Sequence, residues 1–331
     1  MNVTVHQRPG VYSAYDASSV VSGSGAGKQV GLVAVNAKAV ANEVKIVTSY
    51  DGAVNAFGQG TMAELVRLAL KNGAGAVAAV PIAGGEGYAD GFAALEGLED
   101  ITAVICDSTD GDVQKAMKQS VETASANRRE RIAVAAGGAG ETVDELIARA
   151  KALNHERVVL VAPGGVNQNG EAADGLGVAA AVAGAIAGES DPAVPLGGAV
   201  LTGLYGLSGR YSDGEMDRLI FGGVTPVESL AGTIGVVRGV TTRTTTGEAA
   251  DATWRDLTTI RIVDDVIPTL RRALRTKFQR AKNTAQSRGA IRAQVVLELE
   301  NKKAREIITG FENVTVTADS QDPARCLVDF S

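Results

Sequence analysis

The chain has 331 residues, of which 45% are hydrophobic and 21% charged, so one large domain or two moderate ones with a sizeable core are expected. A net charge of −6 and an aromatic content of only 4% argue against a general nucleic-acid binder, which needs basic surfaces and rings that stack on bases. Two cysteines, Cys106 and Cys326, are too few for a disulfide framework or a thiolate zinc site, which fits a reducing cytoplasm.

Neither the N-terminus nor the longest apolar run of the sequence indicates a secreted or membrane protein. The N-terminus has no basic-then-apolar signal peptide, and the longest apolar run, Leu176–Gly188, is too short to span a bilayer. We therefore expect neither secretion nor direct insertion into a membrane.

The first predicted element is a short strand at 2–6, where polar and apolar residues alternate. Arg8-Pro9-Gly10 breaks it, and a Ser/Gly-rich stretch to Lys28 is typical of a flexible turn or linker. Next come predicted strands at 29–35 and 76–82, with a helix at 61–71 between them whose apolar residues share one face.

The middle of the sequence alternates strands and helices. Strands are predicted at 101–106, 131–135 and 157–161, and each precedes a helical segment, at 111–125, 143–153 and 176–187. The strands show little polar–apolar alternation, as expected where helices cover both faces of a parallel sheet. This pattern predicts an α/β fold with a flavodoxin-like, doubly wound middle layer, its parallel-sheet core at about 95–190.

After Pro195 glycines divide the sequence into short pieces, and a new unit begins near Trp254. A strand is predicted at 257–263, then a helix with Asp265 as N-cap and Pro268 in its first turn, where the missing N–H costs little. The apolar stripe of this helix comprises Val266, Ile267, Leu270, Leu274 and Phe278.

A second helix at about 290–305 leads to strands at 314–317 and 326–330, which form a predicted hairpin. These elements indicate a smaller α+β C-terminal domain. The predicted organisation is an N-terminal arm at 1–20, an α/β body at 21–250 and the C-terminal domain at 251–331.

Charge is distributed unevenly. Between Arg255 and Glu306 thirteen Lys and Arg face six Asp and Glu, so this stretch carries +7 and the remainder −13. Two hypotheses remain open: a solvated amphipathic helix, or a basic surface that meets an acidic partner. The basic helix residues are Arg271, Arg272, Arg275, Lys277 and Arg280.

No motif indicates catalysis, a metal site or a cofactor. A nucleophilic triad would depend on His155, because His6 lies in a predicted arm, and His155 is typical of a surface turn. Cys106 ends a predicted buried strand and is interpreted as core. The acidic residues Asp213, Glu215 and Asp217 are interpreted as solvated.

Two glycine-rich segments resemble phosphate-binding loops. The segment 22–28 has Ser22 in place of the first glycine and is followed by Gln29 instead of the Ser or Thr that holds magnesium. The segment 137–142 follows a strand and precedes a helix, so its N–H groups could cradle an anion, although a plain turn is the simpler interpretation. A flavodoxin-like enzyme or nucleotide-binding protein using the loops after the middle strands is the alternative function; a basic-helix adaptor for nucleic acid is a third.

Landmarks in a fixed order along the sequence are similar to one known family. They are Arg8-Pro9-Gly10-Val11-Tyr12; Phe57-Gly58 followed by a helix and Asn72-Gly73; Pro195 to Leu204, where Leu201-Thr202-Gly203 replaces the usual Ala-Gly; Arg243-Thr244; and the predicted strand and helix at 257–278. Together they resemble the contractile tail sheath family of bacteriophage tails and related contractile particles. The large outer insertions of some sheaths are absent, and the sequence ends at Ser331 where relatives usually continue into another segment.

The resemblance implies a non-enzymatic subunit of a virion that stacks as hexameric rings around a tube and contracts to drive that tube through a bacterial envelope. It implies assembly in the bacterial host cytoplasm, with the chain itself, the tail tube protein, and baseplate and tail terminator proteins as partners, and no nucleic acid or cofactor.

Strand exchange between subunits is also implied, and the open edges of the predicted terminal strands agree with it. We expect the arm to add to a neighbour's C-terminal sheet and the C-terminal domain to act in polymerisation. The arm residues are Val3, Val5, Arg8, Pro9, Gly10, Val11 and Tyr12. The edge-strand residues are Val314, Val316, Leu327 and Phe330.

Overall fold

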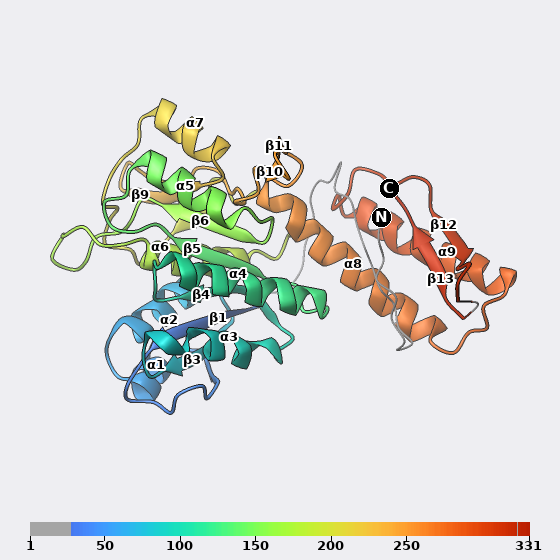
Figure 1. Ribbon diagram of the computed structural model, residues 1–331, viewed down its shortest axis with the longest axis horizontal. Coiled ribbons are helices and arrows are strands. Elements are labelled where there is room, and N and C mark those ends of the chain that lie inside the picture. Colours follow the sequence, from blue (N-terminus) through green and yellow to red (C-terminus); the bar gives the residue numbers. More distant parts are fainter. Residues whose placement is uncertain (1–27, 323) are drawn as a thin grey trace. The chain divides into compact units, whose positions relative to one another are not determined.

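The computed structural model describes residues 28–322 and 324–331, so the predicted arm and its strand at 2–6 lie outside the described residues. The described part of the protein divides into two compact units (Figure 1). The body contains residues 28–190 and 195–257, and the C-terminal unit contains residues 191–194 and 258–331 except Pro323.

A nine-stranded sheet in the order β2-β3-β1-β4-β5-β6-β8-β9-β7 forms the centre of the body. Neighbouring strands from β3 to β8 in this order pair in parallel, whereas β2 pairs antiparallel with β3, and β9 pairs antiparallel with both β8 and β7. The strands are β1 (Gln29–Val35), β2 (Lys45–Val47), β3 (Ala76–Ile82), β4 (Ile101–Cys106), β5 (Ile132–Ala136), β6 (Val158–Ala162), β7 (Val200–Leu201), β8 (Thr225–Leu230) and β9 (Thr233–Val236).

The first five parallel strands along the sequence are β1, β3, β4, β5 and β6. In the sheet they lie in the order β3-β1-β4-β5-β6, so the first two strands exchange places. This is the flavodoxin-like order of a doubly wound sheet. The predicted α/β fold class is therefore confirmed, and β1, β3 and β8 extend the parallel sheet on both sides of the stretch at about 95–190.

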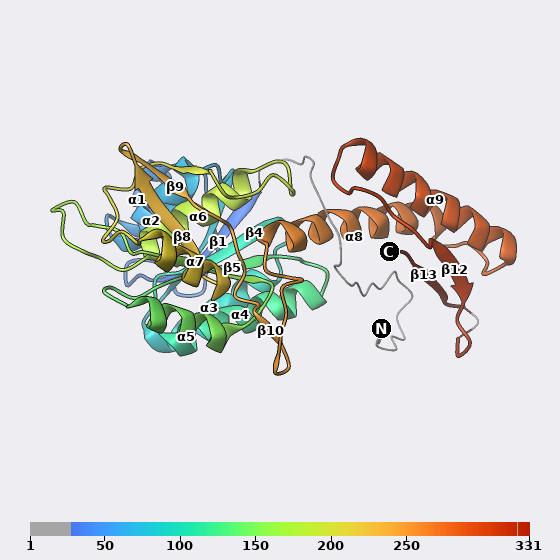
Figure 2. The same cartoon turned by 90° about the horizontal axis from the view of Figure 1, so that it is seen from above.

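Helices cover both faces of this sheet (Figures 1 and 2). On one face the core includes residues of α3 (Tyr88–Glu96), α4 (Gly111–Ala126), α5 (Val143–Leu153) and α7 (Asp213–Phe221). The helices α1 (Tyr50–Phe57), α2 (Thr61–Lys71) and α6 (Leu176–Gly188) pack on the other face. All seven residues of β3 are buried, which explains why the sequence shows no alternation there.

Arg131 precedes β5 and is only 1% exposed. Its guanidinium donates hydrogen bonds to the carbonyl oxygens of Leu95 (3.0 Å) and Leu98 (2.6 Å), at the end of α3, and of Arg129 (3.3 Å). The guanidinium thereby gives further hydrogen bonds to carbonyl groups at and just beyond the end of α3. Burial lowers the pKa of Arg131 to about 10, so the group remains charged at neutral pH.

The C-terminal unit is a helical pair with a β-hairpin: α8 (Leu257–Phe278), α9 (Ala285–Ala304), β12 (Thr315–Ala318) and β13 (Cys326–Asp329). The predicted strand at 257–263 is wrong, because these residues form the start of the long helix α8. Its β-branched residues favour a strand locally, but Ile262, Val266, Leu270 and Leu274 repeat every four residues and pack together into the core.

Two further predictions depended on that strand and are also wrong. Pro268 lies inside α8 instead of in a first turn. Asp265 also lies inside α8 and so is not an N-cap; its carboxylate forms an ion pair with Lys302 of α9. Helix α9 begins five residues before its predicted start because the Thr284 hydroxyl accepts a hydrogen bond from Ser287 N and caps the helix.

Candidate assembly surfaces

The basic residues predicted on one helix do not all share one environment. Arg272, Arg275 and Lys277 are exposed on α8, Arg271 is half-buried, and exposed Arg280 lies in the turn after the helix. Lys277 Nζ donates to Gln294 Oε1 of α9 at 2.6 Å. The freely projecting part of the predicted surface is therefore narrower than the sequence pattern indicates, and it centres on Arg272 and Arg275.

This basic surface is held in place by the core beneath it. Arg271, Arg272 and Arg275 lie on the same turns as buried Leu270 and Leu274. Residues of α8 and α9 form a continuous apolar cluster with the hairpin, and Phe278 packs against its edge. Of the predicted apolar stripe, Val266, Leu270 and Leu274 belong to this cluster and Phe278 packs against it, while Ile267 is buried outside the cluster.

The predicted C-terminal hairpin is present. β12 and β13 pair antiparallel from Thr315 with Asp329 to Ala318 with Cys326. Among the described residues this sheet has two strands only, so neither strand has a neighbour on its outer edge. A two-stranded sheet with unpaired edges is a template for another strand.

The four predicted edge residues take different positions. Val314 is buried just before β12, and Val316 and Phe330 pack against the core of the unit. Leu327 pairs with Thr317 on the opposite face of the hairpin and is half-buried. The arm residues Val3, Val5, Arg8, Pro9, Gly10, Val11 and Tyr12 lie outside the described residues.

A flavodoxin-like sheet would bind a ligand where the winding direction reverses, at the carboxyl ends of β1 and β4. Here Asp107 follows β4, and its carboxylate accepts hydrogen bonds from Val35 N at 2.9 Å and from the Tyr88 hydroxyl at 2.6 Å. Burial and this hydrogen bond raise the pKa of Tyr88. Both carboxylate oxygens are therefore engaged inside the protein.

The glycine-rich loop after β5 is also satisfied internally. Gly138 N donates to Glu141 Oε2 at 2.8 Å, and Glu141 pairs with Arg149 of α5. Thr142 and Glu145 form a reciprocal capping box at the start of α5. A carboxylate of the same loop thus occupies the position where an anion would receive a backbone hydrogen bond, which favours the plain-turn interpretation.

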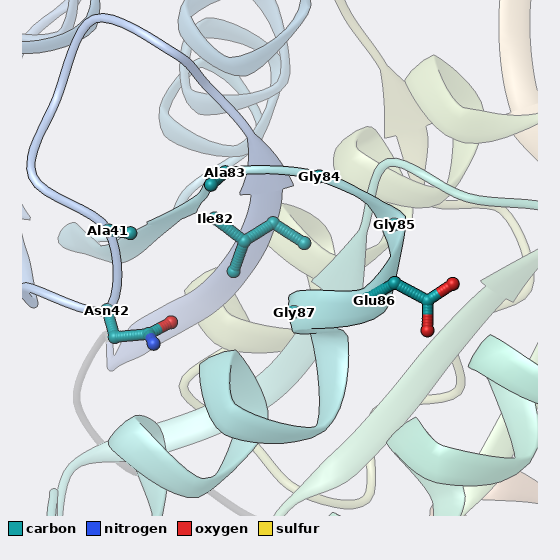
Figure 3. A pocket seen from close by; sticks show the side chains of 8 residues that line it. All are labelled: Ala41, Asn42, Ile82, Ala83, Gly84, Gly85, Glu86 and Gly87. Carbon is teal, nitrogen blue, oxygen red and sulfur yellow. The ribbon is translucent and has the colours of Figure 1, made fainter.

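A shallow hollow of about 220 Å³ lies at the carboxyl end of β3 (Figure 3). Ile82 lies at its centre, Asn42 lies on the opposite wall from Glu86, and the Glu86 carboxylate points away from Asn42. Ligand sites combine apolar walls with several convergent polar groups. This hollow offers one amide and a run of glycines, so it provides little for specific recognition.

The two candidate catalytic residues have structural partners. Cys106 is buried, which raises the pKa of its thiol to about 12 and disfavours the reactive thiolate. His155 Nδ1 accepts from Arg157 N at 3.0 Å, so Nε2 carries the proton and faces Glu122 Oε1 at 3.0 Å. The imidazole is 16% exposed, which makes it a largely buried turn residue instead of the expected surface one.

The predicted solvated carboxylates belong to α7. Asp213 and Glu215 lie in its first turn, where Ser212 and Glu215 form a second capping box. Among residues 28–322 and 324–331, no three His, Cys, Asp or Glu side chains are grouped as metal ligands would be. Within the same residues no helix is both long and apolar enough to cross a membrane.

Two family models match the sequence one after the other. The phage tail sheath protein central domain matches residues 82–242, and the phage tail sheath C-terminal domain matches residues 249–331. The chain belongs to the phage tail sheath protein family. The resemblance inferred from the ordered landmarks is thereby confirmed, and the sheath C-terminal domain includes α8, α9 and the hairpin. No curated protein matches this sheath protein in sequence.

Solved sheath structures share the fold. A sheath tail protein from Desulfitobacterium hafniense aligns with a TM-score of 0.74 at 13% identity, covering 97% of this chain and 99% of that protein. A sheath tail protein from Listeria innocua aligns with a TM-score of 0.72 at 13% identity, over 93% and 95% of the two proteins. The contracted helical sheath of the anti-feeding prophage gives 0.72 at 17% identity, over 98% and 95%.

Sequence reasoning missed the residues that engage the polar groups at the carboxyl edge of the sheet, where a flavodoxin-like protein would bind a ligand. The roles of Asp107, Tyr88 and Glu141 depend on contacts between segments that are not adjacent in sequence. It also missed the small hairpin of β10 (Thr245–Thr246) and β11 (Ala249–Ala250). The Asn154 side-chain oxygen accepts a hydrogen bond from Thr244 N at 3.0 Å, just before this hairpin begins. In the sequence, the Thr-rich run that contains Gly247 is the feature that could have predicted the turn.

Proposed function

We propose that this protein is the structural subunit of a contractile sheath, which polymerises as stacked hexameric rings around a tube and contracts to drive the tube through a bacterial envelope. The observation that carries the proposal is the ordered match of both sheath domains to 82–242 and 249–331. Similar folds occur in the anti-feeding prophage sheath and in a contracted extracellular contractile injection system sheath.

Strand addition would link the subunits. The hairpin of β12 and β13 has unpaired outer edges among the described residues, and backbone hydrogen bonds to an added strand depend little on side chains. The proposed donor is the N-terminal arm of a neighbouring copy, through Val3 to Tyr12. Such a link would hold subunits together while their bodies move.

The proposed partners are further copies of the same subunit, the tail tube protein, and baseplate and tail terminator proteins. Exposed Arg272 and Arg275 would meet acidic groups of the tube or of an adjacent subunit. The proposed location is the virion or a related particle, after assembly in the host cytoplasm. We infer no cofactor and no nucleic-acid partner.

No observation favours the enzyme alternative. The Asp107 carboxylate at the carboxyl edge of the sheet is engaged by Val35 and Tyr88, and the Gly138 N–H of the loop after β5 is engaged by Glu141. We propose a non-enzymatic role on this basis together with the family membership. A phosphate-ligand thermal-shift panel tests the alternative, and we expect no change in the melting temperature.

Electron microscopy tests the proposed function directly. The purified protein, alone and co-expressed with its tube protein, is expected to form rings or tubes with a regular axial repeat. A protein that stayed monomeric in both preparations would contradict the sheath role. The matched specimen is the variant without residues 1–10, which should remain folded but fail to polymerise.

A further inference from the structure

The sequence contains the dipeptide Asn-Gly twice, at Asn72-Gly73 and Asn169-Gly170. In this dipeptide the glycine nitrogen can attack the asparagine amide carbon, because no Cβ on glycine hinders the approach. A succinimide ring closes through the new bond, the bond from that carbon to the amide nitrogen of asparagine breaks, and ammonia leaves. Water then opens the ring to aspartate or isoaspartate. The reaction needs a mobile asparagine amide and a peptide nitrogen that solvent can deprotonate.

Asn72 is held in a geometry that prevents the attack. Its Nδ2 donates to Leu68 O at 2.8 Å and to Thr202 O at 3.0 Å, while its Oδ1 accepts from Thr202 N at 2.8 Å. The backbone of Gly73 packs against Gly188 of α6. Both polar atoms of the amide are therefore engaged, and the Gly73 N–H donates to Leu70 O at 3.3 Å.

Asn169 lies in the opposite environment, at the exposed tip of the hairpin-like loop after β6. Residues 167–172 are all exposed, and no hydrogen bond of the Asn169 amide group is found within the described part of the protein. Gly170 has a φ of +81° and open space around its Cα. Its N–H donates to Asn167 O at 3.0 Å, a single hydrogen bond at a loop tip that can open with little cost.

We propose that Asn169 is a site of spontaneous deamidation in the folded protein, whereas Asn72 in the same dipeptide is protected by the fold. The product places a new negative charge beside Glu171, whose carboxylate accepts from Asn167 Nδ2 at 2.7 Å. The isoaspartate form also lengthens the backbone inside the turn that Asn167 Oδ1 stabilises through Asn169 N and Glu171 N. The loop therefore changes in charge and in shape as the protein ages.

Peptide mass spectrometry of the full-length protein tests this inference. During incubation in mildly alkaline buffer, the peptide with Asn169 is expected to gain the mass of an amide-to-acid exchange and to separate into two isomers. The peptide with Asn72 should react at least about tenfold more slowly, because about 1.4 kcal/mol of opening free energy lowers the reactive population tenfold. Incubation in urea is the matched control, in which both peptides should react at similar rates.

Two results would overturn the proposal. One is that both peptides react in urea while Asn169 stays unmodified in the folded protein, since the turn would then protect it. The other is that Asn72 and Asn169 react equally fast in the folded protein. Neither result bears on the sheath role, which rests on the family match and on polymer formation.

Discussion

The carbonyl oxygen of Ala69 on α2 lies 2.3 Å from the point that a Cβ atom would occupy at Gly184 on α6. No side group at position 184 fits at that distance, so only glycine allows these two helices to approach so closely. Gly188 meets the backbone of Gly73 in the same way, at 2.6 Å. The two helices thus pack backbone to backbone on one face of the sheet.

Gly184→Ala is expected to lower the free energy of unfolding by about 1–3 kcal/mol, because the added methyl group forces α2 and α6 apart. Gly177→Ala on the same helix is the control, since its Cβ would meet only the flexible ends of two side chains, Leu68 at 3.3 Å and Leu204 at 3.7 Å. Alanine also has a higher helix propensity than glycine, which favours this variant. Urea unfolding measures both variants; equal loss in the two would contradict the close-packing explanation.

His155 should make folding stability depend on pH. Burial lowers its pKa below the ordinary 6.5, so the unfolded protein binds a proton at a higher pH than the folded protein. The contribution of His155 to stability is therefore fully present above about pH 6.5, and it is lost as the pH drops through the folded pKa. The urea midpoint of His155→Gln should fall less than that of the unchanged protein between about pH 7.5 and 5.5. An identical fall in both would show that other groups cause it.

Cys106→Ser is expected to leave folding and assembly essentially intact, because the thiol is buried and burial disfavours the reactive thiolate. With a pKa of about 12, Cys106 should resist iodoacetamide at neutral pH until the protein unfolds, whereas half-buried Cys326 should react first. Alkylation followed by mass spectrometry gives the order. Loss of particle activity in a variant that still assembles would mean that Cys106 has a catalytic role.

Reversal of Arg271, Arg272 and Arg275 to Glu should weaken polymer formation and flatten its dependence on salt. Each exposed pair contributes only about 0–1 kcal/mol, but the contact would recur at every subunit. The control reverses three exposed basic residues of the body, Lys38, Lys151 and Arg210, which changes the net charge equally. Light scattering across a salt series measures assembly; equal behaviour of both triple variants would leave only the solvated-helix hypothesis.

Deletion of residues 1–10 is expected to abolish polymers while the body unfolds at a nearly unchanged temperature. The reason is that the arm would contribute backbone hydrogen bonds to a neighbour's hairpin and not to the body core. Electron microscopy and differential scanning calorimetry provide the two measurements. Full-length tubes built from the truncated protein, or an arm paired with the sheet of its own subunit in the polymer, would refute strand exchange.

Much of the body could be predicted because its elements carry strong local patterns. The strands at 29–35, 76–82 and 101–106 and the helices at 61–71 and 143–153 agree with the structure to the residue. Buried strands without alternation, separated by amphipathic helices, indicate a parallel sheet directly. The hairpin of β12 and β13 followed in the same way from two β-rich runs close in sequence.

The start of α8 could not be predicted in that manner. Residues 257–263 are rich in Thr, Ile and Val, which favour strands when judged alone. In the folded protein Ile262 begins a four-residue repeat that packs with Ile291 and Val295 of α9, and burial of this stripe outweighs the local preference. Residues 257–263 alone do not reveal which helix they pack against.

Local sequence by itself determined the class of fold, most element positions and the family landmarks, because these depend on residues within a few positions of one another. The tertiary structure decided which polar side chains remain free to bind a ligand or to react. Asp107 directly follows a strand, where α/β enzymes place catalytic groups, yet Val35 N, 72 residues earlier, and the Tyr88 hydroxyl engage both of its oxygens. The same rule separates Asn72 from Asn169: one dipeptide is locked by Thr202 across 130 residues and the other is open to water, since hydrogen bonds between distant segments form only when the protein has folded.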